Sequence, residues 1–125
     1  MKKSFRTILL VLAWVVGILA TSTVALAAES YKSVTVSTTW TTIATNSNGF
    51  GCNVQIAGYL TSVGHRIDVR MLGRSGNILW SEDDSCPGLS TRVYWCGADV
   101  YSIQVRVDSG VTGTAYASPT SNPAD

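Results

Sequence analysis

A regular alternation of apolar and polar residues is the feature that most limits how this chain can fold. Over residues 65–72, Ile67, Val69 and Met71 fall on one side of an extended chain, and charged residues fall on the other. Residues 101–108 repeat this pattern around three β-branched side chains. Each run predicts a β-strand with one face in a core and the other in water. No long segment after residue 27 has the three- and four-residue apolar spacing of an amphipathic helix.

Residues that favour turns divide the rest of the chain into short segments. Residues 73–77 predict a hairpin loop, residues 82–88 a polar loop, and residues 97–99 a break between two strands. About seven to eight short strands at roughly ten-residue spacing are typical of a small antiparallel β-sandwich of the jelly-roll or immunoglobulin-like kind. We therefore expect a single all-β domain over residues 28–117. Because it contains two prolines and few apolar residues, the segment 118–125 is predicted to be a disordered tail.

The N-terminal 27 residues have the three regions of a bacterial secretory signal peptide. Lys2, Lys3 and Arg6 precede an apolar run over residues 8–20, and the small-residue segment after it ends in Ala25-Leu26-Ala27. The apolar run has 13 residues, fewer than the roughly 20 that a membrane-spanning helix needs. We expect a cleaved signal-peptide helix and a mature protein that is secreted, extracellular and not held in the membrane. An uncleaved N-terminal anchor is the alternative.

The charge of the whole chain is mostly a property of that segment. The chain has 9 Lys and Arg against 8 Asp and Glu, a formal net charge of +1. Without Lys2, Lys3 and Arg6, the remaining residues carry 6 basic against 8 acidic groups, a formal charge of −2. A nearly neutral domain with dispersed arginines lacks the basic patch of a nucleic-acid-binding protein. We therefore expect no nucleic-acid partner.

Three cysteines, Cys52, Cys86 and Cys96, remain in the 98 residues after the predicted cleavage site. A domain of this size gains from a covalent cross-link, and cysteine pairs usually oxidise outside the cytoplasm. Because Cys86 and Cys96 flank a short segment with a Pro-Gly turn, we favour a disulfide between them, and pairing of Cys52 with either stays open. The third cysteine is then expected to be a buried apolar residue or to form an intermolecular disulfide.

Residues 67–117 resemble the bacterial pre-peptidase C-terminal domain in the order of their elements. The resemblance covers a strand, a turn, a second strand, an acidic loop and a final strand, at residues 67–72, 75–77, 78–80, 82–85 and 101–107. It implies a secreted, jelly-roll-like β-sandwich that is a non-catalytic accessory module. Such modules help secreted enzymes fold or bind surfaces, and some bind calcium. The chain departs from the family in the pair Cys86/Cys96, with Tyr94-Trp95 between them.

Groups that support catalysis are scarce in this chain. His65 is the only histidine, which excludes multi-histidine metal sites, and no G-x-S-x-G nucleophile motif accompanies it. His65 lies at the start of a predicted strand, where a histidine with a structural hydrogen bond is the ordinary case. Export favours disulfide formation over a reactive thiolate. We therefore predict that the protein is not an enzyme.

Glu82, Asp83 and Asp84 form a run of three consecutive carboxylates. In a loop, their oxygens are suitable ligands for calcium, which takes six to eight of them. The run lacks the alternating spacing of a calcium-binding loop, so a solvated acidic loop without a cofactor is the competing interpretation.

The aromatic residues are the strongest indication of a ligand. Trp and Tyr combine a large contact area with a polar atom, and they are enriched where proteins hold their partners. Tyr94 and Trp95 are adjacent in a predicted strand, so their side chains must point to opposite faces and at least one should be exposed. We take Tyr94 and Trp95 as the candidate ligand-binding residues, and we expect Trp40 and Trp80 in the core.

These observations favour a small secreted binding module that recognises an extracellular glycan, a cell-wall polymer or a protein surface. Such a module should present a shallow patch with exposed aromatic side chains. The alternative is a small secreted effector, either an antibacterial toxin or a protease inhibitor. That effector would act through a rigid, protruding loop from Ser85 to Leu89.

Overall fold

Residues 30–125 are described by the structure, a computed structural model, and this part of the chain is built from strands and loops. In chain order the strands are β1 (Ser30–Tyr31), β2 (Ser33–Thr35), β3 (Thr41–Thr45), β4 (Cys52–Leu60), β5 (Arg66–Leu72), β6 (Ile78–Pro87), β7 (Thr91–Cys96), β8 (Ser102–Arg106) and β9 (Gly113–Pro119). The predicted signal peptide, residues 1–27, lies outside the described residues. Within residues 30–125 there is no helix long and apolar enough to cross a membrane.

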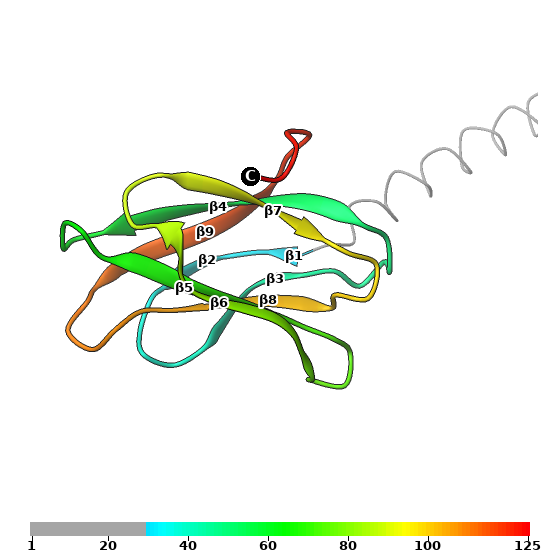
Figure 1. Ribbon diagram of the computed structural model, residues 1–125, viewed down its shortest axis with the longest axis horizontal. Coiled ribbons are helices and arrows are strands. Elements are labelled where there is room, and N and C mark those ends of the chain that lie inside the picture. The colour runs from blue at the N-terminus through cyan, green and yellow to red at the C-terminus, as the bar shows by residue number, and fades with distance from the viewer. Residues whose placement is uncertain (1–29) are drawn as a thin grey trace, which may run out of the picture.

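The strands form two antiparallel sheets that pack face to face (Figure 1). The five-stranded sheet has the order β1-β3-β8-β5-β6, and the four-stranded sheet has the order β2-β9-β4-β7. The predicted all-β antiparallel sandwich is therefore confirmed. The described residues contain more strands than the expected seven or eight because two very short ones, β1 and β2, begin the domain.

The alternating residues place one face of each sheet in the interior. Ile67 and Val69 of β5 are fully buried, as are Ile103 and Val105 of β8. They belong to one apolar cluster with Ile56 of β4, which comes from the other sheet. Burial of a Val or Ile side chain contributes roughly 1.5–3 kcal/mol, so the alternation in the sequence accounts directly for the packing of the two layers.

β6 extends through the segment that the sequence predicts as an acidic loop. Glu82 pairs with Val69 of β5 and Cys86 pairs with Ile67, with an irregularity of register between them. Asp84 lies in this bulge with a φ of 53°. The prediction of a loop is wrong because β5 supplies pairing partners on both sides of the bulge, and such partners are invisible in a local pattern.

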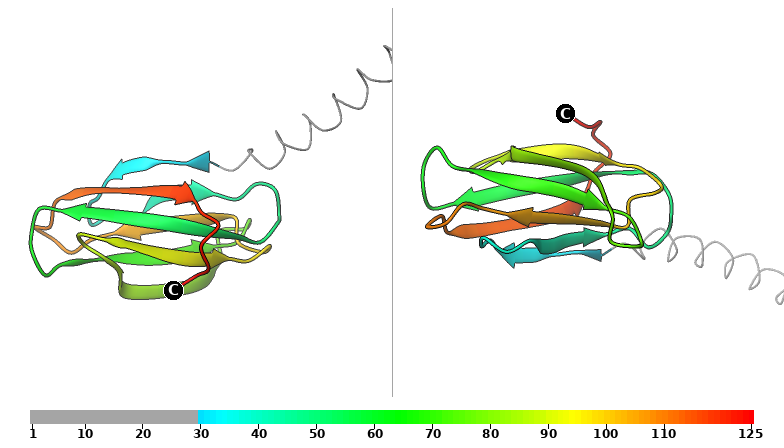
Figure 2. Two further views of the ribbon diagram at one scale, coloured as in Figure 1. Left: turned by 90° about the horizontal axis from the view of Figure 1, so that it is seen from above. Right: turned by 60° about the horizontal axis from the view of Figure 1, so that its bottom comes forward.

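The segment after β9 is tied to the domain. β9 itself continues to Pro119, and Asp125 forms two hydrogen bonds with Val93 of β7. The Asp125 N–H donates to the Val93 carbonyl at 3.0 Å, and the Val93 N–H donates to the Asp125 carboxylate at 2.8 Å. Figure 2 shows this segment, in red, running from β9 towards β7. The predicted disordered tail over residues 118–125 is corrected at residues 118 and 119, which belong to β9, and Asp125 contacts the open edge of β7.

The predicted disulfide between Cys86 and Cys96 is not present, and no disulfide joins the cysteines of the described residues. Cys86 lies beside the short turn that links β6 to β7, whereas Cys96 is the last residue of β7. From Thr91 to Cys96, β7 runs five steps of about 3.3 Å, which carries Cys96 roughly 16 Å away from the turn. A disulfide needs Cα atoms about 4.4–6.8 Å apart. The prediction is wrong because Cys86 lies at one end of β7 and Cys96 at the other.

Candidate functional site

One side of the sandwich carries the edges of both sheets. β6 is the last strand of the five-stranded sheet, and β7 is the last strand of the four-stranded sheet. Only three residues, 88–90, connect them, so the two edges lie on the same side of the molecule (Figure 2). Side chains from both layers can reach a ligand at such an opening.

A shallow groove of about 420 Å³ lies along this side. Leu79 and Trp80 line it from β6, Arg92 and Trp95 line it from β7, and Asp99 lines it from the connection after β7. Trp95 is 58% exposed and Leu79 is 40% exposed. The groove therefore combines exposed apolar surface with one cationic residue, Arg92, and two anionic residues, Asp99 and Asp125.

Tyr94 supports the groove from inside the domain. Its ring packs edge-on against Trp80 with ring centroids 6.0 Å apart, and its hydroxyl lies 3.1 Å from Oγ of Ser85. Burial, followed by the nearby Cys86 thiol, raises the pKa of Tyr94 well above its ordinary value. The phenol therefore keeps its proton at neutral pH, and Tyr94 is a rigid support for Trp80 rather than a proton acceptor.

The guanidinium of Arg92 is held in a fixed position. Its Nη1 donates to the carbonyl oxygen and to the hydroxyl of Ser85, both at 2.9 Å, and lies 3.7 Å from a carboxylate oxygen of Glu82. Its Cζ is 5.0 Å from the centroid of the Tyr94 ring. The side chain remains 27% exposed. Arg92 is thus a pre-oriented hydrogen-bond donor at the groove.

Trp95 and Tyr94 point to opposite faces of β7, as the sequence predicts, and Trp95 is the exposed member of the pair. The indole of Trp95 lies over Gly51, in the connection between β3 and β4. A Cβ atom at position 51 would come within 2.6 Å of the Cζ2 and Cη2 atoms of this indole. The absence of a side chain at Gly51 therefore leaves the space that the indole occupies.

Ala124 and Asp125 also line the groove. Because Asp125 bonds to both backbone groups of Val93, this one residue of the chain itself occupies part of the edge of β7. An unpaired strand edge accepts an added strand in this way. The groove is therefore bordered by a backbone edge that is able to bind another extended chain.

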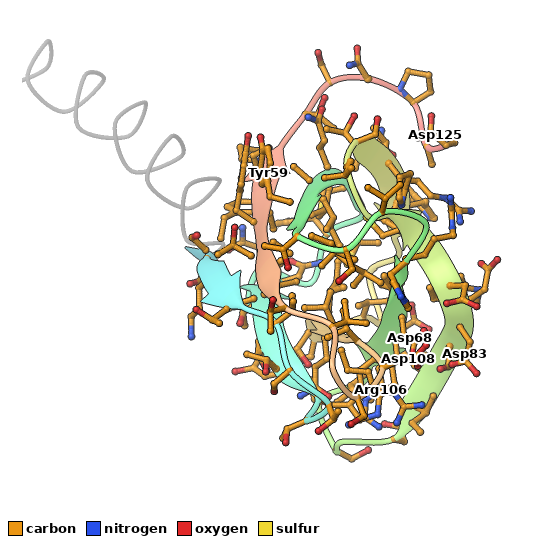
Figure 3. All side chains as sticks on the ribbon, turned by 90° about the vertical axis from the view of Figure 1, so that its left-hand side faces the viewer. Tyr59, Asp68, Asp83, Arg106, Asp108 and Asp125 are labelled. Atoms are coloured by element: carbon orange, nitrogen blue, oxygen red, sulfur yellow. The ribbon has the colours of Figure 1, made fainter. Side chains whose placement is uncertain are left out.

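The acidic residues predicted as a calcium site turn to different partners. Glu82 lies 3.7 Å from Arg92, and Asp83 lies 3.8 Å from Arg106, as Figure 3 shows for the second pair. Within residues 30–125, no group of three His, Cys, Asp or Glu side chains is placed to hold a metal ion. Glu82 and Asp83 thus face arginines of different strands, and the calcium site suggested for Glu82, Asp83 and Asp84 stays a prediction.

His65 is exposed just before β5 begins. Met71, near the other end of β5, is the residue of that strand that lines the groove. Six residues of extended chain separate the two, which corresponds to roughly 20 Å. The histidine is therefore remote from the groove.

The segment from Ser85 to Leu89 does not protrude. Ser85, Cys86 and Gly88 are buried, and the Gly88 carbonyl accepts a hydrogen bond from the Leu60 N–H of β4 at 2.7 Å. Leu89 is the largely exposed residue of the segment, with 62% of its surface accessible. This geometry differs from the rigid, projecting loop that an effector of the predicted kind needs.

Trp40 lies outside the apolar core, against the arginines of the five-stranded sheet. The Cζ atoms of Arg70 and Arg106 are each 4.4 Å from its ring centroid, and Arg70 Nε donates to Oε1 of Gln104 at 2.8 Å. The prediction of a core position is wrong for Trp40, whereas Trp80 packs partly buried against the core. Arginines at the polar positions of two predicted strands were the available signal for this cluster.

Comparison of the chain with protein-family models, with curated proteins and with solved structures finds no match in any of the three. The resemblance of residues 67–117 to the pre-peptidase C-terminal domain therefore stays a prediction. A functional interpretation has to come from the geometry of the groove.

Proposed function

We propose that this protein is a secreted, non-catalytic binding module that holds an extracellular glycan in the groove between β6 and β7. The proposal depends on one observation: Trp95, which is 58% exposed, lines the same groove as the charged residues Arg92 and Asp99. An indole offers a flat apolar surface for the face of a sugar ring, and charged groups form strong hydrogen bonds to hydroxyls.

The rigidity of the groove supports the same proposal. Tyr94 holds Trp80 from below, and Ser85 holds Arg92 through two hydrogen bonds. Side chains that are already fixed lose little conformational entropy when a ligand binds. The groove is also open rather than enclosed, which suits a polymer chain better than a small molecule that must be surrounded.

An extended peptide is the second candidate ligand. The hydrogen bonds between Asp125 and Val93 favour it, because both backbone groups of Val93 are accessible to a partner at the edge of β7. A peptide at this edge would replace Asp125, whereas a sugar stacked on Trp95 would not need to.

Retention on insoluble cellulose, chitin and peptidoglycan tests the glycan proposal. We expect the exported protein to bind at least one of them. Replacement of Trp95 by Ala should weaken this binding about tenfold, because aromatic stacking contributes about 1 kcal/mol or slightly more. Absence of retention on all three polymers would contradict the proposal.

Tyr59 provides a matched control. It is 52% exposed and stacks on Tyr116 with ring centroids 5.6 Å apart, but it does not line the groove. Tyr59→Ala should leave retention unchanged, and an equal loss in both variants would show non-specific adhesion. Asp125→Ala tests the peptide alternative, because it removes the carboxylate that accepts from the Val93 N–H and should strengthen binding of an extended peptide.

A further inference from the structure

Cys52 and Cys96 lie directly opposite each other on adjacent strands. Cys52 is the first residue of β4, Cys96 is the last residue of β7, and the two are Cα partners in the antiparallel register. Directly opposed residues have Cβ atoms roughly 4.5–5.5 Å apart, and a disulfide needs about 3.5–4.5 Å. Because both residues are at strand ends, the required approach is a small local adjustment.

The two side chains also share one face of the sheet and one cavity. Both line a small cavity of about 10 Å³, together with Tyr31 and Asn46. Cys96 is 1% exposed, whereas Cys52 is partly exposed. A reagent can therefore reach Cys52 from solvent, and Cys96 is then the neighbouring thiol.

Cys86 is excluded as a partner for either. It lies on β6 of the other sheet, where its Cα partner is Ile67, and its Sγ lies 3.7 Å from the carbonyl oxygen of Ile56. Burial raises the pKa of the Cys86 thiol to about 11, so little of the nucleophilic thiolate exists at neutral pH. Of the three pairings that three cysteines permit, the fold leaves one.

We infer that Cys52 and Cys96 are a redox modification site, at which exposure to an oxidising compartment forms a cross-strand disulfide between β4 and β7. The position of this bond has a consequence for the groove. Gly51 and Trp95 are the residues immediately before the two cysteines. The disulfide therefore fixes the position of the Trp95 indole relative to Gly51, over which the indole lies. The inference itself does not depend on the proposed glycan.

The reaction needs an external disulfide as the oxidant, either a small one such as oxidised glutathione or that of a thiol-exchange protein. The Cys52 thiol loses its proton to solvent, and the thiolate attacks one sulfur of the oxidant. The oxidant's S–S bond breaks, one thiolate leaves and takes up a proton, and a mixed disulfide remains. Deprotonated Cys96 then attacks Sγ of Cys52 and expels the second thiol. Two electrons pass from the cysteines to the oxidant, which becomes two thiols.

Peptide mapping of the wild-type protein tests this pairing without any variant. Trypsin cleaves after Lys and Arg and places each cysteine on its own peptide, residues 33–66, 75–92 and 93–106. The protein is incubated with oxidised glutathione, denatured, alkylated and digested. We expect peptides 33–66 and 93–106 to be linked, with the mass of two hydrogen atoms lost, and peptide 75–92 to be alkylated. A disulfide on peptide 75–92, or three alkylated peptides, would overturn the inference.

Thermal unfolding gives a second, independent readout. The oxidised protein should melt on the order of 10 °C above the same protein in dithiothreitol, because the cross-link restricts the unfolded chain. Cys52→Ser and Cys96→Ser should each abolish this difference, and Cys86→Ala should retain it. A redox-dependent melting temperature that persists in Cys52→Ser would contradict the pairing.

Discussion

Asp68 and Arg106 form an ion pair of 3.1 Å that joins β5 to β8. Asp68 is 5% exposed, and its other carboxylate oxygen accepts a hydrogen bond from the Asp84 N–H at 2.9 Å. One buried carboxylate thus holds a guanidinium of the neighbouring strand on one side and the bulge of β6 on the other. Figure 3 shows Asp68 and Arg106 together, far from Tyr59.

Replacement of Asp68 by Ala should lower the free energy of unfolding by about 2 kcal/mol, because it leaves the Asp84 N–H without its acceptor. The cost is smaller than for a fully buried pair, since the Arg106 side chain is 39% exposed. Urea denaturation measures it. Asp83→Ala is the control: that side chain is 75% exposed and 3.8 Å from Arg106, and the change should stay below about 0.5 kcal/mol. Equal losses would show that burial of Asp68 is not the cause.

Trp40 should stabilise the domain through its two arginines. Trp40→Leu keeps apolar bulk but removes the contacts with Arg70 and Arg106, and we expect a loss of about 1 kcal/mol in urea denaturation. A double-mutant cycle with Arg70→Gln should show that the two changes together cost less than their sum. Strict additivity would mean that the indole and the guanidinium do not interact energetically.

The predictable part of this fold is the part that local sequence controls. The faces of β5 and β8 follow from the alternation around Ile67 and Ile103, because a strand needs only a period of two to separate its faces. The hairpin between β5 and β6 follows from the turn at residues 73–77, where the Gly76 N–H donates to the Gly73 carbonyl at 3.0 Å. Exposure of one member of the pair Tyr94 and Trp95 follows from their adjacency in a strand, whereas the structure identifies Trp95 as that member.

The parts that escaped prediction depend on residues distant in sequence. The bulge of β6 is supported by Asp68, which belongs to the neighbouring strand. The Trp40 ring packs against the guanidinium groups of two arginines that are at least thirty residues away in sequence. The groove exists because β6 and β7 are the edge strands of different sheets on one side of the sandwich. The order of strands in a sheet cannot be predicted from a local sequence pattern.

Stability should fall at alkaline pH because of Cys86. Burial raises the pKa of this thiol from its ordinary value of 9.0 to about 11. Below pH 9 the thiol is protonated in both states and has no effect. Between about pH 9 and pH 11 the unfolded thiol ionises while the folded one stays protonated, so unfolding is favoured by up to about 2 kcal/mol.

Urea denaturation at pH 8 and pH 10.5 measures this effect. Cys86→Ala should lose less stability between the two pH values than the wild type does. Ionisation of groups that do not interact with Cys86 occurs in both proteins and is removed by the comparison. An identical pH dependence in the two proteins would show that the buried thiol does not contribute.

Gly51 should control binding in the groove without contributing much to stability. The Cβ atom of Gly51→Ala would come within 2.6 Å of the Trp95 indole, and the indole is free to swing aside because it is 58% exposed. We therefore expect the variant to lose polysaccharide retention nearly as far as Trp95→Ala does, about tenfold. Its free energy of unfolding should change by no more than about 0.5 kcal/mol.

Phe50→Ala is the matched control for this experiment. Phe50 precedes Gly51 and is 66% exposed, but it does not line the groove, so its removal should leave retention unchanged. If Gly51→Ala binds as the wild type does, the ligand does not need the indole where the structure has it. If Gly51→Ala instead unfolds readily, the glycine supports the fold rather than the position of Trp95. If Gly51→Ala loses polysaccharide retention while its free energy of unfolding is unchanged, Gly51 acts by positioning the exposed Trp95 side chain in the groove.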